Sequence, residues 1–535
     1  QAQEAEGILK GLLAKGEEGV DVCRVLSALM KDQGRTNEAE EVLLQCLKKN
    51  EKNPVLLLSL AGLYQQTEEY AKAEEIHKRL MQFHPKEDRY VIGLTDFYGK
   101  TGQPEKAEQV LIRIVKEQPE KAAYRLTLAR FYETQTRPEE AIDVLKKAIK
   151  TLPDVLRLRL ELGDIYYRNE QQNLSLRTYQ ELVEKYPLKP ETLTARNRIA
   201  GIYFFQRKMD LAMAQVNEVT DENPKDLEAH FLRGRIFLAQ GKGVDAVSDF
   251  RVVVEENPED PRGYTYLAQA HLLNKEAALA KNNLKKAVDI DPRHNQALEL
   301  LLRVYWQEKA YDDGIKLLKE VTEKAPENLL AISRLGDFYF AEGDLDQAEK
   351  AWAQLIDKAP KNPEGFVKIS RARAHANDPA GAEAALDNAL ALQPQNMGIL
   401  RQVVALQMDL KKPDQAIAKC RDHMRTTPSA EAGTRLVLAE VHRIQKAYSK
   451  AGDELRKALQ LNPDAIAPYV ALGRLYAEQG KLDDGIKEFK AALDRKPDAV
   501  QLKMAIATLH LAKQDENTAL EWYKRIVDEH PNFVP

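Results

Sequence analysis

Apolar residues recur along this chain in a pattern that repeats about every 34 residues. Within each repeat, positions 4, 7, 8 and 11 form one apolar set, and positions 20, 24 and 27 form a second set. Both sets have the spacing of three or four residues that places side chains on one face of an α-helix. Each repeat is therefore predicted to contain two helices, each with one buried face.

Position 20 is the most regular position of the repeat, because its residue is small in every copy. Twelve copies have alanine there, and the exceptions are Ser175, Gly314 and Gly485. Position 8 is also mostly small, as at Gly234 and Gly336. Small residues are expected where two helices cross closely, because a long side chain would hold the backbones apart.

Position 11 carries a large ring in most repeats. It is aromatic at Tyr64, Tyr98, Tyr132, Tyr166, Tyr203, Phe237, Tyr305, Tyr339 and Tyr476, and histidine at 271, 442 and 510. The three histidines are most simply interpreted as core residues that replace the aromatic ring.

Proline and glycine mark the ends of the two predicted helices. Proline occupies position 32 in fourteen successive repeats, at a constant interval broken only before Pro224 and Pro463. It opposes continuation of the second helix, because its ring fixes φ and it lacks an N–H group. The turn inside the repeat contains glycine at 102, 241, 343 and 480, where the first helix can end. The pattern predicts an all-α solenoid of helix pairs.

Two repeats match a known family especially well. Residues 335–360 read LGDFYFAEGDLDQAEKAWAQLIDKAP, and residues 472–497 read LGRLYAEQGKLDDGIKEFKAALDRKP. With their Leu-Gly, Tyr, Gly, small, aromatic and Pro residues in this order, they resemble the tetratricopeptide repeat (TPR) family. The resemblance extends over essentially the whole chain. It implies a right-handed α-α superhelical solenoid of about fifteen repeats.

The repeat register predicts how the chain is organised. Residues 1–18 fit the second helix of a partial leading repeat, 19–187 hold repeats one to five, and 188–361 hold repeats six to ten. Repeats eleven to thirteen are less regular, and we expect 362–446 to be the least stable part and a flexure. Residues 447–535 complete the array and begin a further repeat at Pro531, so we expect a segment of a longer array. Three residues inserted within 188–197 predict a longer first helix or a longer preceding loop.

Composition excludes some classes of function. Charged residues make up 30% of the chain and the formal net charge is −4, with no basic run. Binding of nucleic acid or of an anionic membrane surface is therefore not expected. No apolar stretch reaches the roughly 20 residues needed to span a bilayer.

The three cysteines give no disulfide framework. Cys46 and Cys420 occupy apolar positions of the second helix, and we expect them to be buried free thiols. The alternative for Cys46 is a disulfide with Cys23, which lies at position 4 of the same repeat and would imply an oxidising compartment.

Candidate catalytic and metal-binding motifs are missing. The sequence contains no HExxH, CxxC, GxxxxGK[ST] or GxSxG pattern. We therefore expect no enzymatic activity, no cofactor and no metal site.

The resemblance also implies where partners bind. In this family the first helices line a concave groove, into which positions 2, 5, 9, 12 and 13 point. Apolar pockets in such a groove supply affinity and charged residues set the register, which suits an extended peptide or an amphipathic helix. The alternative is that the residues at position 12 only pack between neighbouring first helices. The predicted groove residues of repeats five to ten are Asp164, Tyr167, Phe204, Phe205, Arg235, Leu238, Gln269, Leu272, Leu273, Arg303, Trp306, Asp337, Phe340 and Arg371.

Two known groove types of the family do not fit this chain. No repeat combines Lys at position 5 with Asn at position 9, as in relatives that bind chaperone tails, and position 6 of the early repeats lacks the asparagine ladder of the sugar transferases. We therefore predict a non-catalytic scaffold or adaptor that binds a protein or peptide. The alternatives are a self-associating architectural component of a bacterial envelope, export or secretion machine, and the docking arm of an enzyme outside this segment. The resemblance to bacterial envelope scaffolds favours the periplasm or cell envelope over the cytoplasm.

Overall fold

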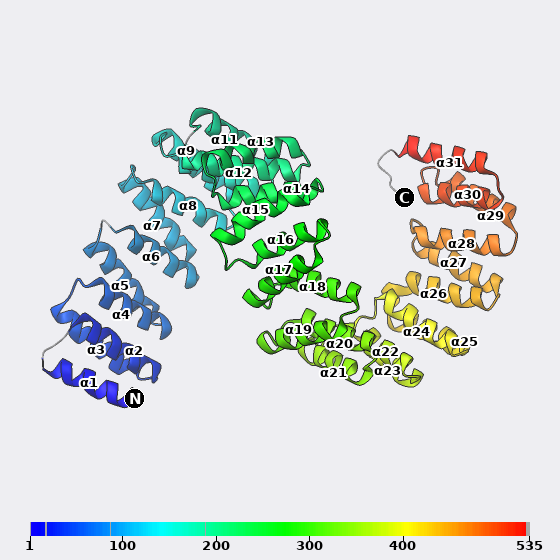
Figure 1. The fold of residues 1–535 in the computed structure, drawn as a ribbon, viewed down its shortest axis with the longest axis horizontal. Helices are drawn as coiled ribbons and strands as arrows, with labels where there is room; N and C mark the ends of the chain where they lie inside the picture. Colours follow the sequence, from blue (N-terminus) through cyan, green and yellow to red (C-terminus); the bar gives the residue numbers. More distant parts are fainter. Residues whose placement is uncertain (1, 16–18, 86, 188, 531–535) are drawn as a thin grey trace. The chain divides into compact units, whose positions relative to one another are not determined.

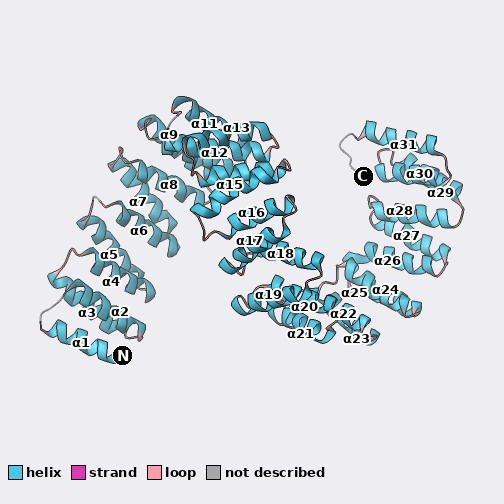
Figure 2. Ribbon diagram, in the orientation of Figure 1, coloured by secondary structure: helices cyan, strands magenta, loops and turns pink. Residues whose placement is uncertain are grey.

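The protein folds almost entirely into α-helices. A computed structural model describes residues 2–15, 19–85, 87–187 and 189–530, and these ranges contain α-helices, one short 3-10 turn and no strand (Figures 1 and 2). The chain divides into two compact units, residues 1–256 and 257–535. The predicted all-α class and the pairing of helices are confirmed.

The first unit begins with a single helix and continues as seven helix pairs. Its helices are α1 (Ala2–Ala14), α2 (Val20–Asp32), α3 (Thr36–Lys49), α4 (Pro54–Gln66), α5 (Tyr70–Phe83), α6 (Asp88–Lys100), α7 (Pro104–Glu117), α8 (Ala122–Thr134), α9 (Pro138–Thr151), α10 (Leu156–Arg168), α11 (Gln172–Lys185), α12 (Pro190–Phe205), α13 (Met209–Glu222), α14 (Leu227–Ala239) and α15 (Gly243–Glu256).

The second unit continues the same pairing. Its helices are α16 (Pro261–Leu273), α17 (Ala277–Ile290), α18 (Asn295–Glu308), α19 (Tyr311–Lys324), α20 (Leu329–Glu342), α21 (Leu345–Lys358), α22 (Glu364–His375), α23 (Pro379–Leu392), α24 (Met397–Asp409), α25 (Pro413–Thr426), α26 (Glu431–Ile444), α27 (Tyr448–Leu461), α28 (Ile466–Glu478), α29 (Leu482–Arg495), α30 (Val500–Ala512) and α31 (Glu516–Glu529). The predicted start of a further repeat at 531–535 lies outside the described residues. The division of the array at 187, 361 and 446 stays a prediction, as does the flexure at 362–446.

The core has the composition that the repeat predicts. Alanine at position 20 is fully buried in most pairs, as at Ala212 and Ala348. Glycine replaces alanine at Gly314, where a larger residue would not fit, because a Cβ atom there would lie 2.1 Å from a ring carbon of Phe338. The histidines at position 11 are buried, which confirms that they belong to the core.

Each turn between the two helices of a pair contains a residue with left-handed backbone. The residue that follows closes the turn, as in the 2.8 Å hydrogen bond from the N–H of Glu69 to the carbonyl of Tyr64. This is the six-residue bond of a Schellman motif. Only five of these residues are glycines, and four of the five are the turn glycines that the sequence indicated. Most of the turns therefore use a residue other than glycine at this position. The left-handed residues are Gly34, Glu68, Gly102, Thr136, Glu170, Arg207, Gly241, Lys275, Lys309, Gly343, Asn377, Lys411, Lys446, Gly480 and Gln514.

Thr136 is the β-branched member of this set, with φ of 55°. Left-handed backbone costs a residue with a Cβ atom about 1 kcal/mol or more, and a β-branched side chain fits it worst. We expect Thr136→Gly to raise the free energy of local unfolding of α8 and α9 by about 1 kcal/mol, measured by native-state hydrogen exchange. The opposite change in the preceding pair, Gly102→Ala at φ 69°, should lower the free energy of local unfolding of α6 and α7. Equal protection in both variants would contradict the proposed strain.

The three-residue insertion lengthens a helix. α12 has 16 residues, whereas the first helices on either side, α10 and α14, have 13. It begins at Pro190, a favourable residue for the first turn of a helix. Of the two predicted alternatives, the longer first helix is therefore confirmed.

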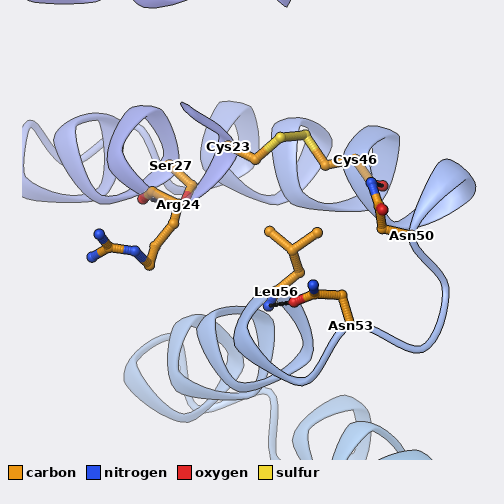
Figure 3. The surroundings of a disulfide bond; sticks show 7 residues. All are labelled: Cys23, Arg24, Ser27, Cys46, Asn50, Asn53 and Leu56. Atoms are coloured by element: carbon orange, nitrogen blue, oxygen red, sulfur yellow. Dashed lines mark hydrogen bonds between the residues drawn. A yellow bond between two sulfur atoms is a disulfide. The ribbon is translucent and has the colours of Figure 1, made fainter. Parts of the chain in front are cut away.

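A disulfide joins the two helices of the first complete pair. Cys23 on α2 and Cys46 on α3 are bonded, with Cα atoms 6.4 Å apart and both side chains fully buried (Figure 3). The expectation of a free thiol at Cys46 is wrong, because positions 4 and 27 face each other across the pair. Cys420 is a buried free cysteine, as predicted, and burial raises the pKa of its thiol to about 12.

Candidate binding groove

A groove of about 890 Å³ lies within the second unit. The first helices of four successive pairs, α18, α20, α22 and α24, form its walls, and buried residues of α21 and α23 contribute to its floor. It is lined by Glu299, Leu302, Arg303, Trp306, Gln307, Arg334, Asp337, Phe338, Phe340, Trp352, Val367, Lys368, Ser370, Arg371, Ala374, Ala382, Leu386, Gln402, Ala405, Leu406 and Asp409.

The repeat explains why these side chains meet. Many of them occupy positions 6, 9 and 12, which are three residues apart and therefore share one face of a helix. Since these positions recur once in every repeat, the same face of each successive first helix contributes to the groove. Five predicted residues line it together: Arg303, Trp306, Asp337, Phe340 and Arg371.

Aromatic rings form much of the apolar lining of the groove. The side chain of Trp306 is 44% exposed, and its ring meets Phe338 edge-on at a centroid distance of 5.2 Å. Phe340 is half-buried, 6.1 Å from the ring of Trp352. The indole N–H of buried Trp352 donates to the carbonyl of Ser333 at 3.1 Å, which fixes the floor. Trp306 therefore offers an accessible aromatic surface on a well-packed base.

Ion pairs neutralise two of the carboxylates that line the groove. Asp337 accepts hydrogen bonds from Arg334 at 3.0 Å and from Lys368 at 2.6 Å. Arg334 also donates to Glu299 at 2.7 Å. Asp337, predicted to set the register of a partner, is therefore already held by two cations from its own chain.

Two arginines of the groove differ from this pattern. Arg303 and Arg371 are both exposed, and neither takes part in any hydrogen bond or ion pair found among the described residues. The guanidinium of Arg371 lies 4.6 Å from the ring centroid of Phe340, a cation–π contact that orients it.

Three further predicted residues of the second unit do not line this groove. Gln269, Leu272 and Leu273 lie on α16, where Leu272 packs against the core and Leu273 is exposed. For Leu272 this agrees with the alternative interpretation, packing between helices.

The remaining predicted residues lie in the first unit. Tyr167 and Phe205 are exposed, whereas Phe204 and Leu238 are half-buried. The carboxylate of Asp164 accepts hydrogen bonds from the hydroxyl of Tyr179 and from Arg198, and the guanidinium of Arg235 covers the ring of Phe204. The role of these residues in binding stays a prediction.

Sequence reasoning missed the residues at position 6 of the groove. Arg334, Lys368 and Gln402 occupy this position in three consecutive repeats and all line the groove. The sequence contained the signal, because these three polar residues occupy the same position in successive repeats.

Other kinds of site are not found in the described part of the chain. No cluster of three or more histidine, cysteine or acidic side chains could hold a metal ion there. Over the same residues, every helix is too short or too polar to cross a membrane.

Solved structures with a similar arrangement share little sequence with this chain. They include a chain of the structure "Naa15/Naa10 bound to HypK-THB" (14% identity, TM-score 0.36, 100% of this chain and 92% of that one). They also include the APC/C hetero-tetramer Cut9-Hcn1, with 15% identity, a TM-score of 0.26, and coverage of 85% of this chain and 96% of that one. Yeast Tom70 has 14% identity, a TM-score of 0.34, and coverage of 80% of this chain and 96% of that one. TM-scores this low support no inference about partners. No curated protein matches the chain.

Family models match the sequence directly. Models described as "Tetratricopeptide repeat" match residues 30–91, 68–131 and 305–366, and residues 205–261, 231–280, 267–328 and 470–532. Two further models with this description match 158–188 and 122–154. Together with the helix pairs, these matches show that the chain belongs to the tetratricopeptide repeat family.

Proposed function

We propose that this chain is a non-catalytic scaffold that binds a segment of a partner protein in the groove formed by α18, α20, α22 and α24. The observation that carries the proposal is Trp306, a tryptophan 44% exposed in the lining of a groove whose other aromatic rings are packed. An accessible tryptophan on a well-packed base, surrounded by arginines, is the composition of an energetic hot spot in protein interfaces.

The shape of the groove supports a protein segment as the occupant. Four successive first helices contribute equivalent positions, so the lining extends along the array rather than enclosing a single compact pocket. Such a surface matches the side chains of a peptide or helix, which present contacts at regular intervals.

The compartment that we propose is oxidising, such as the periplasm. The support is the buried disulfide between Cys23 and Cys46, since proteins of reducing compartments rarely keep structural disulfides.

The proposal is tested by affinity capture from the native host with the wild type and with Trp306→Ala. We expect at least tenfold less partner on the variant, because truncating a hot-spot tryptophan commonly costs more than about 1.4 kcal/mol of binding. Val527→Ala is the matched control, because Val527 is an exposed apolar residue of α31, outside the groove. Circular dichroism must show all three proteins equally folded.

An unchanged set of captured proteins on Trp306→Ala would contradict the proposal. Sedimentation of the purified wild type and variant adds a second readout. If the wild type self-associates and the variant does not, the occupant of the groove is a second copy of this chain.

A further inference from the structure

The charge of the groove indicates what kind of segment it binds, and this inference rests on the proposed function. Three arginines on first helices of the second unit are exposed: Arg303 on α18, Arg371 on α22 and Arg401 on α24. The structure shows no hydrogen bond or ion pair for any of them within the described residues. An exposed guanidinium that makes no ion pair within its own chain can pair with a carboxylate of another molecule.

The carboxylates that face these arginines are few. Asp337 is held by Arg334 and Lys368, and Glu299 by Arg334. Asp409, at the end of α24, is the remaining acidic side chain of the lining and is exposed without a salt bridge in the described structure. Internal pairing therefore leaves an excess of positive charge around Trp306.

A second groove adjoins the first. It has a volume of about 740 Å³ and is lined by α24, α26, α27 and α28. Ala405 and Asp409 line both grooves, so the two are continuous across α24. Exposed apolar side chains mark the second groove, among them Ile444 and Val470.

Ion pairs within the chain hold three of the charged residues that line this second groove. Arg443 donates to Glu440 and Glu478, and Arg474 donates to Glu478. The rest of the lining is mostly apolar and therefore suits apolar side chains, and Arg401 adds a positive charge that no carboxylate of the described chain pairs with.

We propose that the occupant is an amphipathic, acidic protein segment. Its carboxylates contact Arg303, one turn before Trp306 on α18, and Arg371 on α22, and its apolar side chains continue into the groove between α24 and α28. Charge complementarity then sets the register and orientation, whereas the apolar contacts supply most of the affinity.

The test is selection from a phage-displayed library of random 16-residue peptides on the folded full-length chain. The expected result is enrichment of peptides with net negative charge and several aromatic or aliphatic residues. The variant Arg303→Glu/Arg371→Glu should reduce the affinity of the enriched peptides at least tenfold. Val470→Glu, which places a charge in the apolar groove, should reduce the affinity of the same peptides by a comparable factor.

The matched control is Arg293→Glu/Arg425→Glu, because both arginines are exposed and lie outside the two grooves. It should leave peptide binding unchanged. Enrichment of neutral or basic peptides, failure to enrich any peptide, or equal binding by Arg303→Glu/Arg371→Glu would overturn the inference. So would tighter binding of a fluorescent dT20 oligonucleotide than of the selected peptides.

The outcome is separable from that of the proposed function. If capture of the partner is lost in Trp306→Ala but persists in Arg303→Glu/Arg371→Glu, the groove binds a partner and the acidic character of the segment is wrong.

Discussion

Reduction of the disulfide between Cys23 and Cys46 is expected to lower the stability of the first helix pair by about 3 kcal/mol. The bond closes a loop between residues 23 apart in the sequence, and the chain-entropy relation gives about this value for such a loop. Because each repeat contacts only its neighbours, the loss should be confined to α2, α3 and the helices packed against them.

Native-state hydrogen exchange with and without a reducing agent measures this effect. Amides of α2 and α3 should exchange roughly a hundredfold faster after reduction, since about 1.4 kcal/mol corresponds to a factor of ten. Amides of α24 and α25, the pair that holds the free thiol of Cys420, serve as the internal control and should not change. Equal protection of α2 and α3 under both conditions would show that the bond contributes nothing to the fold.

Gly336→Ala is expected to destabilise α20 and α21 by up to about 3 kcal/mol. A Cβ atom at this position would lie 2.2 Å from the indole nitrogen of Trp352, whose N–H donates to the carbonyl of Ser333. The tryptophan is fully buried and cannot move without breaking this hydrogen bond. Local unfolding measured by hydrogen exchange should therefore become easier, and the floor of the groove should loosen.

Gly473→Ala provides the matched control, because Gly473 occupies position 8 of its own repeat, as Gly336 does. The nearest side-chain atom to a Cβ there would be 3.9 Å away, an ordinary contact with Leu509. Alanine is favoured over glycine inside a helix, so this change should stabilise α28 by roughly 0.5–1 kcal/mol. Effects of the same sign in both variants would contradict the packing described for Trp352.

The helix pairs could be predicted from the sequence because one local pattern determines them. Ala348 and Tyr305 have equivalents in most other repeats, and burial of such positions is required in every copy. The same regularity limits the prediction. It continues through Pro258 without a signal, although the structure divides into two units at residues 256 and 257.

Features that depend on individual contacts were harder to predict. Lys309 adopts the left-handed conformation of a turn where other repeats have glycine, because the helix pair determines the backbone there. The unpaired state of Arg303 depends on which neighbours Arg334 and Lys368 bind. Sequence spacing placed Trp306 and Phe340 on one face, but only the structure shows that one ring is exposed and the other is packed.

Site-specific photocrosslinking tests the central claim most directly. A benzoylphenylalanine in place of Trp306 is irradiated in the native host, and the same probe at Val527 of α31 is the control. The account predicts that the probe at 306 crosslinks to a defined segment of one partner protein and that the probe at 527 does not. The account would be contradicted if the partner still binds the chain but crosslinks to the probe at position 527 and never to the probe at position 306.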